Sequence, residues 1–243
     1  MKEKLLIPIS IIIAGFLIAL AVILSPAIWK EKSQAEPIRN TTESEKNQNE
    51  LDKWLEIVEK NFKMPDKNDW INGDLNKAKV VFVVYSDLEC PFCKRFHMTM
   101  KQVMEKYKDQ VAWIYRHFPL ENLHKKAFDE AVALECAGKI GGNDAFWKYV
   151  DKIFEITPSN DGLDLSLLPK FAKEIGINLS EFNKCYSQKE PQEKIKTHLS
   201  EALSIGVQGT PFTLILFDGK KLPIPGYIDF NSLDTQFLSQ VLK

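Results

Sequence analysis

The sequence lacks the motifs that mark several large enzyme classes. It has no Gly-rich phosphate loop, no His-Glu-x-x-His metal motif and no internal repeat. It also lacks an excess of charge of either sign, because 32 Lys and Arg stand against 33 Asp and Glu, a formal net charge of −1. A nearly neutral chain argues against nucleic acid as a partner. These absences direct attention to the few reactive side chains that are present.

Cysteine is scarce, yet two of the four cysteines in the 243 residues lie close together as Cys90-Pro91-Phe92-Cys93. The motif follows the apolar run from Val80 to Tyr85, which is typical of a buried strand, and the residues after it have helical spacing. A C-x-x-C at a strand-to-helix junction indicates a dithiol/disulfide redox centre.

The spacing of the motif also assigns the two thiols different roles. If residues 86–89 form a loop, Cys90 becomes the N-cap of the helix and Pro91 its first residue, a position that favours proline. The Cys90 sulfur would then lie beside the backbone N–H of Cys93 at the positive end of the helix, and both effects lower a thiol pKa. We therefore expect Cys90 to be the nucleophile and the more shielded Cys93 to be the resolving thiol.

Two other interpretations of the motif stay open at this point. The C-x-x-C can be half of a zinc site completed by Cys136 and Cys185, although structural zinc usually takes two close pairs. It can also be an inert structural disulfide. Our preferred interpretation requires no metal and no cofactor.

Cys136 and Cys185 lie far apart on segments with helical patterns. They are either two buried small apolar residues or, in an oxidising compartment, a structural disulfide, which we favour. Neither has a nearby thiol in sequence, so we assign them no catalytic role.

The N-terminal part is expected to hold the protein at a membrane. Residues 5–29 contain no charged side chain and are long enough to span a bilayer as an uncleaved anchor, with a cleaved signal peptide as the alternative. Flanking lysines are balanced, so the positive-inside rule gives no orientation. A stable disulfide suits an oxidising compartment. We therefore expect a cytoplasmic stub at 1–4, a single-pass anchor in the cell membrane and an extracytoplasmic catalytic domain.

After the anchor the chain is expected to form a linker and one globular domain. Residues 30–50 are polar without an apolar period, which predicts a flexible linker, and residues 51–243 form the domain. Its predicted elements are a helix at 51–58, a short strand within 69–74, a strand at 80–85, a helix from 90 to about 108, a strand at 111–118, a helical block at about 121–206, a hairpin of strands at 212–217 and 221–226, and a last helix at 230–242. This order predicts an α/β domain containing a parallel β-α-β unit and a helical insertion.

These motifs together resemble the DsbA-like thiol oxidoreductases of the thioredoxin fold. The resemblance covers residues from about 69 to 243 and rests on Tyr85–Cys93, Arg116–Leu120 with His124, Glu135–Ala137, Ala145–Trp147 and Gly206–Pro211. It implies that Pro211 is the family's cis-proline and Thr210 the residue before it. A bend there would leave backbone groups near Thr210 free beside Cys90, where an extended substrate peptide can pair with them.

The resemblance further implies the substrates and the partner. The expected substrates are unfolded or reduced exported proteins, and the expected reoxidant is a membrane quinone-linked oxidase of the DsbB or vitamin-K-epoxide-reductase type. The alternatives are a reductase or isomerase on the same fold, or a non-enzymatic domain that binds zinc or merely holds partners. Glutaredoxins, which share a Pro-Phe dipeptide, are a second possible fold relative.

Two side chains next to the cysteines in the sequence bear on the redox potential, and one histidine is considered for catalysis. Phe92 stands where many members of the family have a histidine, and phenylalanine donates no hydrogen bond to a thiolate. Glu89 would raise the Cys90 pKa if its carboxylate pointed toward the sulfur. His124 is predicted to be structural rather than catalytic.

Overall fold

The computed structural model describes residues 41–188 and 190–242. The expected stub at 1–4 and anchor at 5–29 lie outside these residues. Among the helices of the described ranges, none is long and apolar enough to cross a membrane.

The described elements follow the predicted order closely. The strands are β1 (Trp70–Asn72), β2 (Val80–Ser86), β3 (Val111–His117), β4 (Phe212–Phe217) and β5 (Lys220–Pro225). The helices are α2 (Thr41–Asn61), α3 (Pro91–Tyr107), α4 (Ala127–Ile156), α5 (Leu168–Glu174), α6 (Leu179–Tyr186), α7 (Glu190–Ser204), α8 (Phe230–Leu233) and α9 (Ser239–Val241), with short turns η1 (Lys108–Gln110), η2 (Leu165–Leu167) and η3 (Asp234–Leu238).

A five-stranded mixed sheet in the order β1-β3-β2-β4-β5 forms the centre of the molecule. The strands β2 and β3 are parallel and joined through α3, so the predicted β-α-β unit is confirmed. Both are buried along nearly their whole length because helices cover the two faces of the sheet. The strand β5 carries two prolines at the sheet edge, where a missing N–H costs no ladder hydrogen bond.

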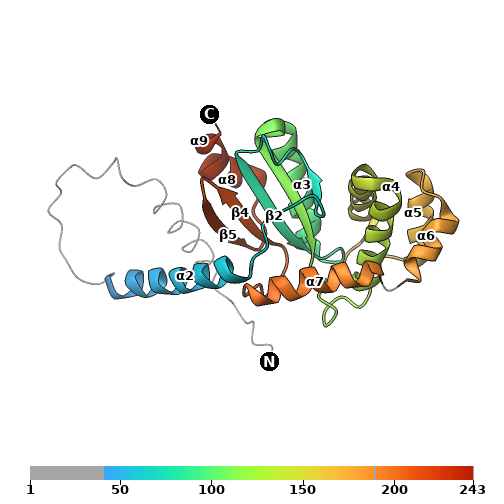
Figure 1. The fold of residues 1–243 in the computed structure, drawn as a ribbon, viewed down its shortest axis with the longest axis horizontal. Helices are drawn as coiled ribbons and strands as arrows, with labels where there is room; N and C mark the ends of the chain where they lie inside the picture. Colours follow the sequence, from blue (N-terminus) through green and yellow to red (C-terminus); the bar gives the residue numbers. More distant parts are fainter. Residues whose placement is uncertain (1–40, 189, 243) are drawn as a thin grey trace, which may run out of the picture.

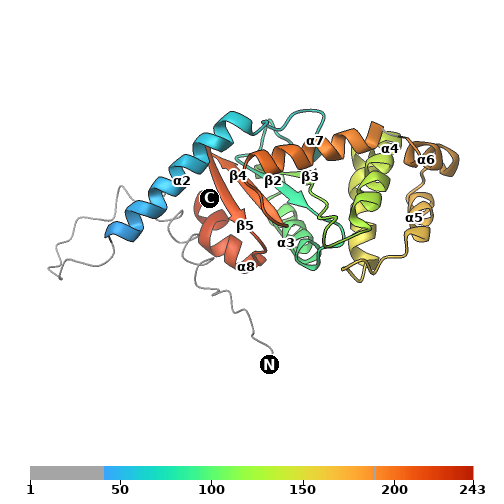
Figure 2. The same cartoon turned by 90° about the horizontal axis from the view of Figure 1, so that it is seen from below.

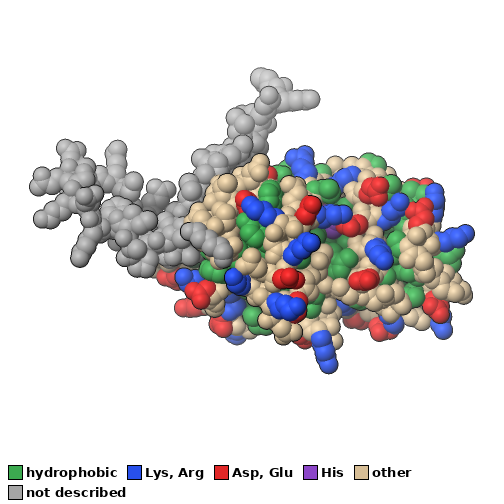
Figure 3. All heavy atoms as spheres, turned by 90° about the horizontal axis from the view of Figure 1, so that it is seen from above, with side chains coloured by type: hydrophobic (Ala, Val, Ile, Leu, Met, Phe, Trp, Pro, Cys, Tyr) green, Lys and Arg blue, Asp and Glu red, His purple; other side chains and the backbone are tan. Residues whose placement is uncertain are grey.

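Two pairs of helices enclose the sheet, with α3 and α8 on one face and α2 and α7 on the other (Figures 1 and 2). Phe82, Phe96 and Met100 belong to the apolar core on the α3 side, which continues into the helices α4–α6. A second core, on the α2 and α7 side, contains Val58 and Ile205. On the face drawn in Figure 3, charges of both signs are interspersed.

The helical insertion is shorter than predicted. The helices α4 to α6 form a separate lobe beside the sheet, but α7 runs back along the sheet and packs against β3 and β4 (Figure 2). Ala202 and Leu199 supply part of that contact. The helical periodicity of 121–206 is the same in both parts, so only tertiary packing separates α7 from the lobe. Gly142 forms a kink inside α4, where its φ is 75°.

The predicted linker at 30–50 is wrong for its second half, because α2 begins at Thr41. Residues 41–50 lack an apolar stripe, but Glu, Lys and Gln are good helix formers, and they extend a helix whose amphipathic half is already docked. The last helix, predicted as one piece over 230–242, instead contains the π-type turn η3 between α8 and α9.

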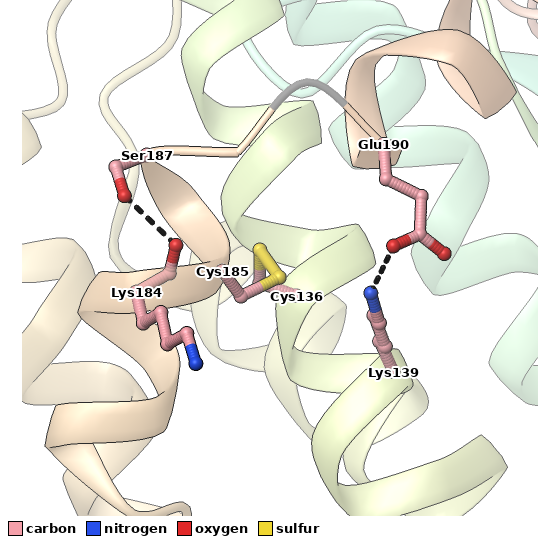
Figure 4. Close-up of a disulfide and its surroundings, with 6 residues drawn as sticks. All are labelled: Cys136, Lys139, Lys184, Cys185, Ser187 and Glu190. Atoms are coloured by element: carbon pink, nitrogen blue, oxygen red, sulfur yellow. Dashed lines mark hydrogen bonds and ion pairs between the residues drawn. A yellow bond between two sulfur atoms is a disulfide. The ribbon is translucent and has the colours of Figure 1, made fainter.

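Cys136 and Cys185 are joined by a disulfide that connects α4 to α6 across 49 residues of sequence (Figure 4). Lys139 and Glu190 form an ion pair beside it, between α4 and the start of α7. The bond therefore ties together two helices of the lobe whose packing also depends on the core residue Phe182.

Removing this disulfide should lower the free energy of unfolding by about 4 kcal/mol, because a loop of 49 residues is no longer closed in the unfolded chain. The measurement is urea unfolding of the double variant Cys136→Ser/Cys185→Ser. Both proteins should carry Cys90→Ser/Cys93→Ser so that no other disulfide forms. Adding reductant should make the two curves coincide, and identical curves before reduction would contradict the prediction.

Candidate active site

Cys90 lies at the junction where β2 ends and α3 begins. It is the N-cap of α3, with extended backbone angles (φ −78°, ψ 122°), and Pro91 is the first helical residue, as predicted. Its N–H donates to the Asp87 carbonyl oxygen at 3.3 Å, which fixes the turn before the helix. Both cysteines carry free thiols, with exposed fractions of 5% for Cys90 and 1% for Cys93. Cys90 is therefore the less enclosed of the two.

The residue before Pro211 lies directly against Cys90. The strand β4 runs antiparallel to β2 with Phe212 opposite Tyr85, so the start of β4 adjoins the end of β2. The Thr210–Pro211 peptide is cis. The Cys90 thiol donates to the Thr210 carbonyl oxygen at 3.4 Å. The sequence motifs placed at 90–93 and 210–211 therefore meet at one point of the surface.

The Cys90 thiol is acidic, although for reasons that differ in part from the prediction. A hydrogen bond from the Cys93 thiol is the largest influence, and despite burial it lowers the pKa of Cys90 to about 6, with help from the Thr210 side chain and from the N–H groups of Cys93 and Phe92. Among the described residues the protonated sulfur accepts no cap hydrogen bond, because the thiol is instead turned toward Thr210 as a donor. The helix N-terminus thus contributes less than the neighbouring thiol.

Cys93 behaves in the opposite way. Burial, together with the hydrogen bond to Cys90 and its negative charge, raises the pKa of Cys93 well above its usual range. The Asp87 N–H donates to the Cys93 sulfur at 3.4 Å and only partly offsets this. The pair therefore holds one proton near neutral pH, on Cys93, and presents one thiolate, on Cys90.

The pair formed by Asp87 and His124 was not predicted from the sequence. Asp87 is 1% exposed, and its carboxylate accepts hydrogen bonds from the N–H groups of Glu89 and Leu120 and lies 2.9 Å from His124 Nδ1. Burial works against the charged imidazole, but the hydrogen bond to Asp87 and the negative charges of Asp87 and Cys90 raise the pKa of His124. His124 is thus an electrostatic neighbour of Cys90, not only a structural residue.

Glu89 points away from the cysteine sulfur and toward the helical lobe. Its carboxylate accepts hydrogen bonds from the N–H groups of Gly162 and Leu163, each at 3.2 Å, and its carbonyl oxygen accepts one from Asn160 at 2.8 Å. The residue before the nucleophile is therefore bonded to the loop after α4. It does not supply the like charge that would have raised the Cys90 pKa.

A second carboxyl group lies behind Glu89. Glu130 is fully buried, and within the described part of the chain neither of its oxygens has a hydrogen-bond partner. Burial, followed by the neighbouring Glu89, raises the pKa of Glu130 to about 10. Glu130 is therefore protonated at neutral pH.

Phe92 lies on the surface between the two cysteines, with 49% of its area exposed, and the Arg95 guanidinium stands 5.2 Å from its ring centre.

The zinc interpretation loses its other two ligands, because the sulfurs of Cys136 and Cys185 are bonded to each other and a disulfide sulfur is not a thiolate ligand.

The missed residues had a weak signal in the sequence. Asp87 follows β2 and His124 follows β3 by a few residues, and functional groups gather outside the carboxyl ends of parallel strands. Glu130 had none, because its position depends on how the lobe folds back over the site.

The sheet, with a C-x-x-C dithiol at the N-terminus of a helix and a cis-proline loop beside it, is a thioredoxin-like fold that carries a thiol–disulfide site. The chain belongs to the family described as Thioredoxin, whose sequence model matches residues 65–229.

Curated relatives share only part of their length with this chain. The match to the Na(+)/H(+) antiporter NhaA 1 of Mycolicibacterium vanbaalenii is 34% identical over 139 residues, 57% of this chain and 20% of that protein. NhaA 3 of Salinispora tropica is 29% identical over 147 residues, 60% of this chain and 21% of that protein. The chain thus spans about a fifth of these relatives, and their names describe the whole proteins.

Solved structures match a larger share of this chain than the curated relatives do. Pseudomonas aeruginosa DsbA2 is 29% identical with a TM-score of 0.60, over 74% of this chain and 98% of that one. Wolbachia pipientis alpha-DsbA1 is 26% identical with a TM-score of 0.61, over 73% and 92%. The catalytic domain of Proteus mirabilis ScsC, at 22% identity and a TM-score of 0.61 over 79% and 98%, shares the fold.

Alkylation of reduced protein by iodoacetamide should follow one ionisation with a midpoint near pH 6, because only the Cys90 thiolate is both formed and accessible. Mass spectrometry should place the label on Cys90 and leave Cys93 unmodified. The pKa is lowered on folding, so the stability that this group contributes to the reduced protein is present above about pH 9 and is lost as the pH falls through about 6. A midpoint above pH 8 would contradict the assignment.

Replacing His124 by Ala should raise the pKa of Cys90 by up to about one unit. The Cys90 thiolate stabilises the positive charge of His124, so that positive charge stabilises the thiolate by the same amount, and the variant loses this attraction. The alkylation profile measures the shift. His97→Gln is the matched control, since His97 is buried on α3 itself but pairs with Asp151. An unchanged midpoint in His124→Ala would show that the two groups do not interact.

Proposed function

We propose that this protein is an extracytoplasmic, membrane-tethered thiol:disulfide oxidoreductase that introduces disulfides into exported proteins. The observation that carries the proposal is the asymmetric dithiol, in which an acidic Cys90 lies beside the backbone of Thr210 and Cys93 is more deeply buried and protonated. The likeness to DsbA structures above 25% identity supports the same reaction class.

In the proposed reaction, a substrate thiolate attacks the Cys90 sulfur of the oxidised Cys90–Cys93 pair. The disulfide breaks, a mixed disulfide forms at Cys90, and the Cys93 sulfur leaves and takes up a proton. A second substrate thiolate then attacks the substrate sulfur of the mixed disulfide and releases Cys90 as a thiolate. Two electrons pass from the substrate to the enzyme, and a membrane quinone-linked oxidase of the DsbB or vitamin-K-epoxide-reductase type takes them on.

The direction of the reaction follows from the stability of the reduced form. A thiolate that is favoured at neutral pH is a good leaving group and stabilises the dithiol over the disulfide, which makes the disulfide oxidising. The Phe92 side chain donates no hydrogen bond to that thiolate, whereas the Cys93 thiol, the Thr210 side chain and the charge of His124 favour it. The second disulfide, Cys136–Cys185, fits an oxidising compartment.

The reduction potential of the Cys90–Cys93 pair tests the proposal. A value near −120 mV, measured against glutathione by alkylation trapping, together with disulfide formation in a reduced two-cysteine peptide, would support the proposal. A value near −270 mV would favour a reductase or isomerase instead. Cys93→Ala should accumulate mixed disulfides with exported proteins, because the adduct on Cys90 can no longer be cleared from within. Cys90→Ala is the control that should accumulate none.

A further inference from the structure

The helix α2 stands outside the part of the chain that defines the family. The family match begins at residue 65, whereas α2 spans Thr41–Asn61. It lies against the sheet face opposite α3, beside the end of α7 (Figures 1 and 2). Val58 on this helix is fully buried, so α2 is part of the packed domain and not a free extension.

One side chain of α2 contacts both ends of the active-site loop 206–211. The Trp54 Nε1–H donates to the Ile205 carbonyl oxygen at 2.8 Å, where α7 ends and the loop begins. A Cβ at Gly206 would lie 3.7 Å from the same indole ring. At the other end, the Phe212 ring stands edge-on to the indole with 6.3 Å between ring centres.

The loop between these two contacts carries the backbone that touches the nucleophile. Thr210, whose carbonyl oxygen accepts from the Cys90 thiol, lies between Gly206 and Phe212. Backbone hydrogen bonds hold the loop near both ends, because the Val207 N–H donates to the Ala202 carbonyl oxygen at 2.9 Å and the Gly226 N–H donates to the Pro211 carbonyl oxygen at 2.8 Å. Between these bonds the loop has open space at Gly209, where a Cβ would meet nothing within 4 Å. Its geometry therefore depends on what holds its ends.

Asn61 and Lys63, at the end of α2 and just after it, also hold the C-terminal end of α7, but their contacts do not reach Phe212 at the other end of the loop. The Asn61 side chain donates to the Ser204 carbonyl oxygen at 3.3 Å, and the Lys63 N–H donates to Glu201 at 2.7 Å. Trp54 differs from these residues in that it also contacts Phe212, the first residue of β4.

We propose that Trp54 is a positioning residue that holds the loop 206–211 from behind, so that the Thr210 backbone stays beside Cys90 in the geometry needed to pair with an extended, thiol-bearing peptide. The inference rests on the proposed function for its substrate class. It gives α2 a role in substrate capture, in addition to covering the sheet.

The test compares Trp54→Phe and Trp54→Ala with the wild-type protein. Oxidation of a reduced two-cysteine peptide should show a KM raised at least about fivefold in Trp54→Ala, which loses the hydrogen bond and the ring contacts, and less in Trp54→Phe, which keeps a ring. Alkylation of Cys90 by iodoacetamide at pH 8, where the thiol is ionised in every variant, should stay within about twofold, because this small reagent needs no loop.

Val58→Ala is the matched control, since it removes a buried apolar side chain from the same helix and leaves the Trp54 contacts in place. Urea unfolding gives the stability loss of each variant. A KM rise in Val58→Ala equal to that in Trp54→Ala would reduce Trp54 to a stability residue and overturn the inference, as would an unchanged KM in Trp54→Ala.

A second readout separates this inference from the proposed function. The Thr210 side chain helps to lower the pKa of Cys90, whereas its carbonyl oxygen accepts from the thiol and favours the protonated form, so a displaced loop should shift the midpoint of the alkylation profile in Trp54→Ala and not in Val58→Ala. If no variant, including the wild-type protein, oxidises the peptide, the proposed function fails while this midpoint still decides the position of the loop. An unshifted midpoint in Trp54→Ala would then refute the inference.

Discussion

The antiparallel pairing of β2 with β4 is the constraint on which the site depends. With Tyr85 opposite Phe212, the last residues of one strand adjoin the first residues of the other. The chain leaves β2 toward Cys90 and enters β4 from Thr210, so the register alone places the Cys90 thiol beside the Thr210 backbone that we propose pairs with a substrate peptide. A slip by one residue would turn every side chain of β4 to the opposite face, and the two buried cores make such a slip costly.

Cys90 and Cys93 carry chemically identical thiols, and the difference between their pKa values comes from their surroundings. Cys93 is enclosed by the sheet and α3 and keeps its proton, and that proton then stabilises a thiolate on Cys90. Asp87 links the two, since its backbone contacts both cysteines and its carboxylate holds His124. The helical lobe takes part as well, because Glu89 bonds to its loop at 162–163. The lobe is thus attached at the residue before the nucleophile, and its stability bears on the geometry of the site.

Much of this fold could be predicted from the sequence, because its strands are short apolar runs and its motifs fall at their ends. The N-cap position of Cys90 followed from the Pro91 preference. What could not be predicted depends on contacts between distant segments. Whether α7 belongs to the lobe or to the sheet is decided by packing and not by periodicity. The orientation of Glu89, the partner of His124 and the role of Trp54 depend on residues 30 or more positions away, for which a single sequence carries no distance information.

The direction of electron flow depends on how strongly the surrounding groups together stabilise the Cys90 thiolate. Neither side chain of the Pro91-Phe92 dipeptide between the cysteines donates to the Cys90 thiolate, so the stability of this thiolate must come from other groups. The structure supplies it from three directions: the Cys93 thiol in the core, Thr210 on the loop that Trp54 supports, and His124 held by Asp87. Each of these belongs to a different element. The redox preference of the centre is therefore a property of how the sheet, the loop after β3 and α2 pack together, and a change in any one of them acts on the same sulfur atom.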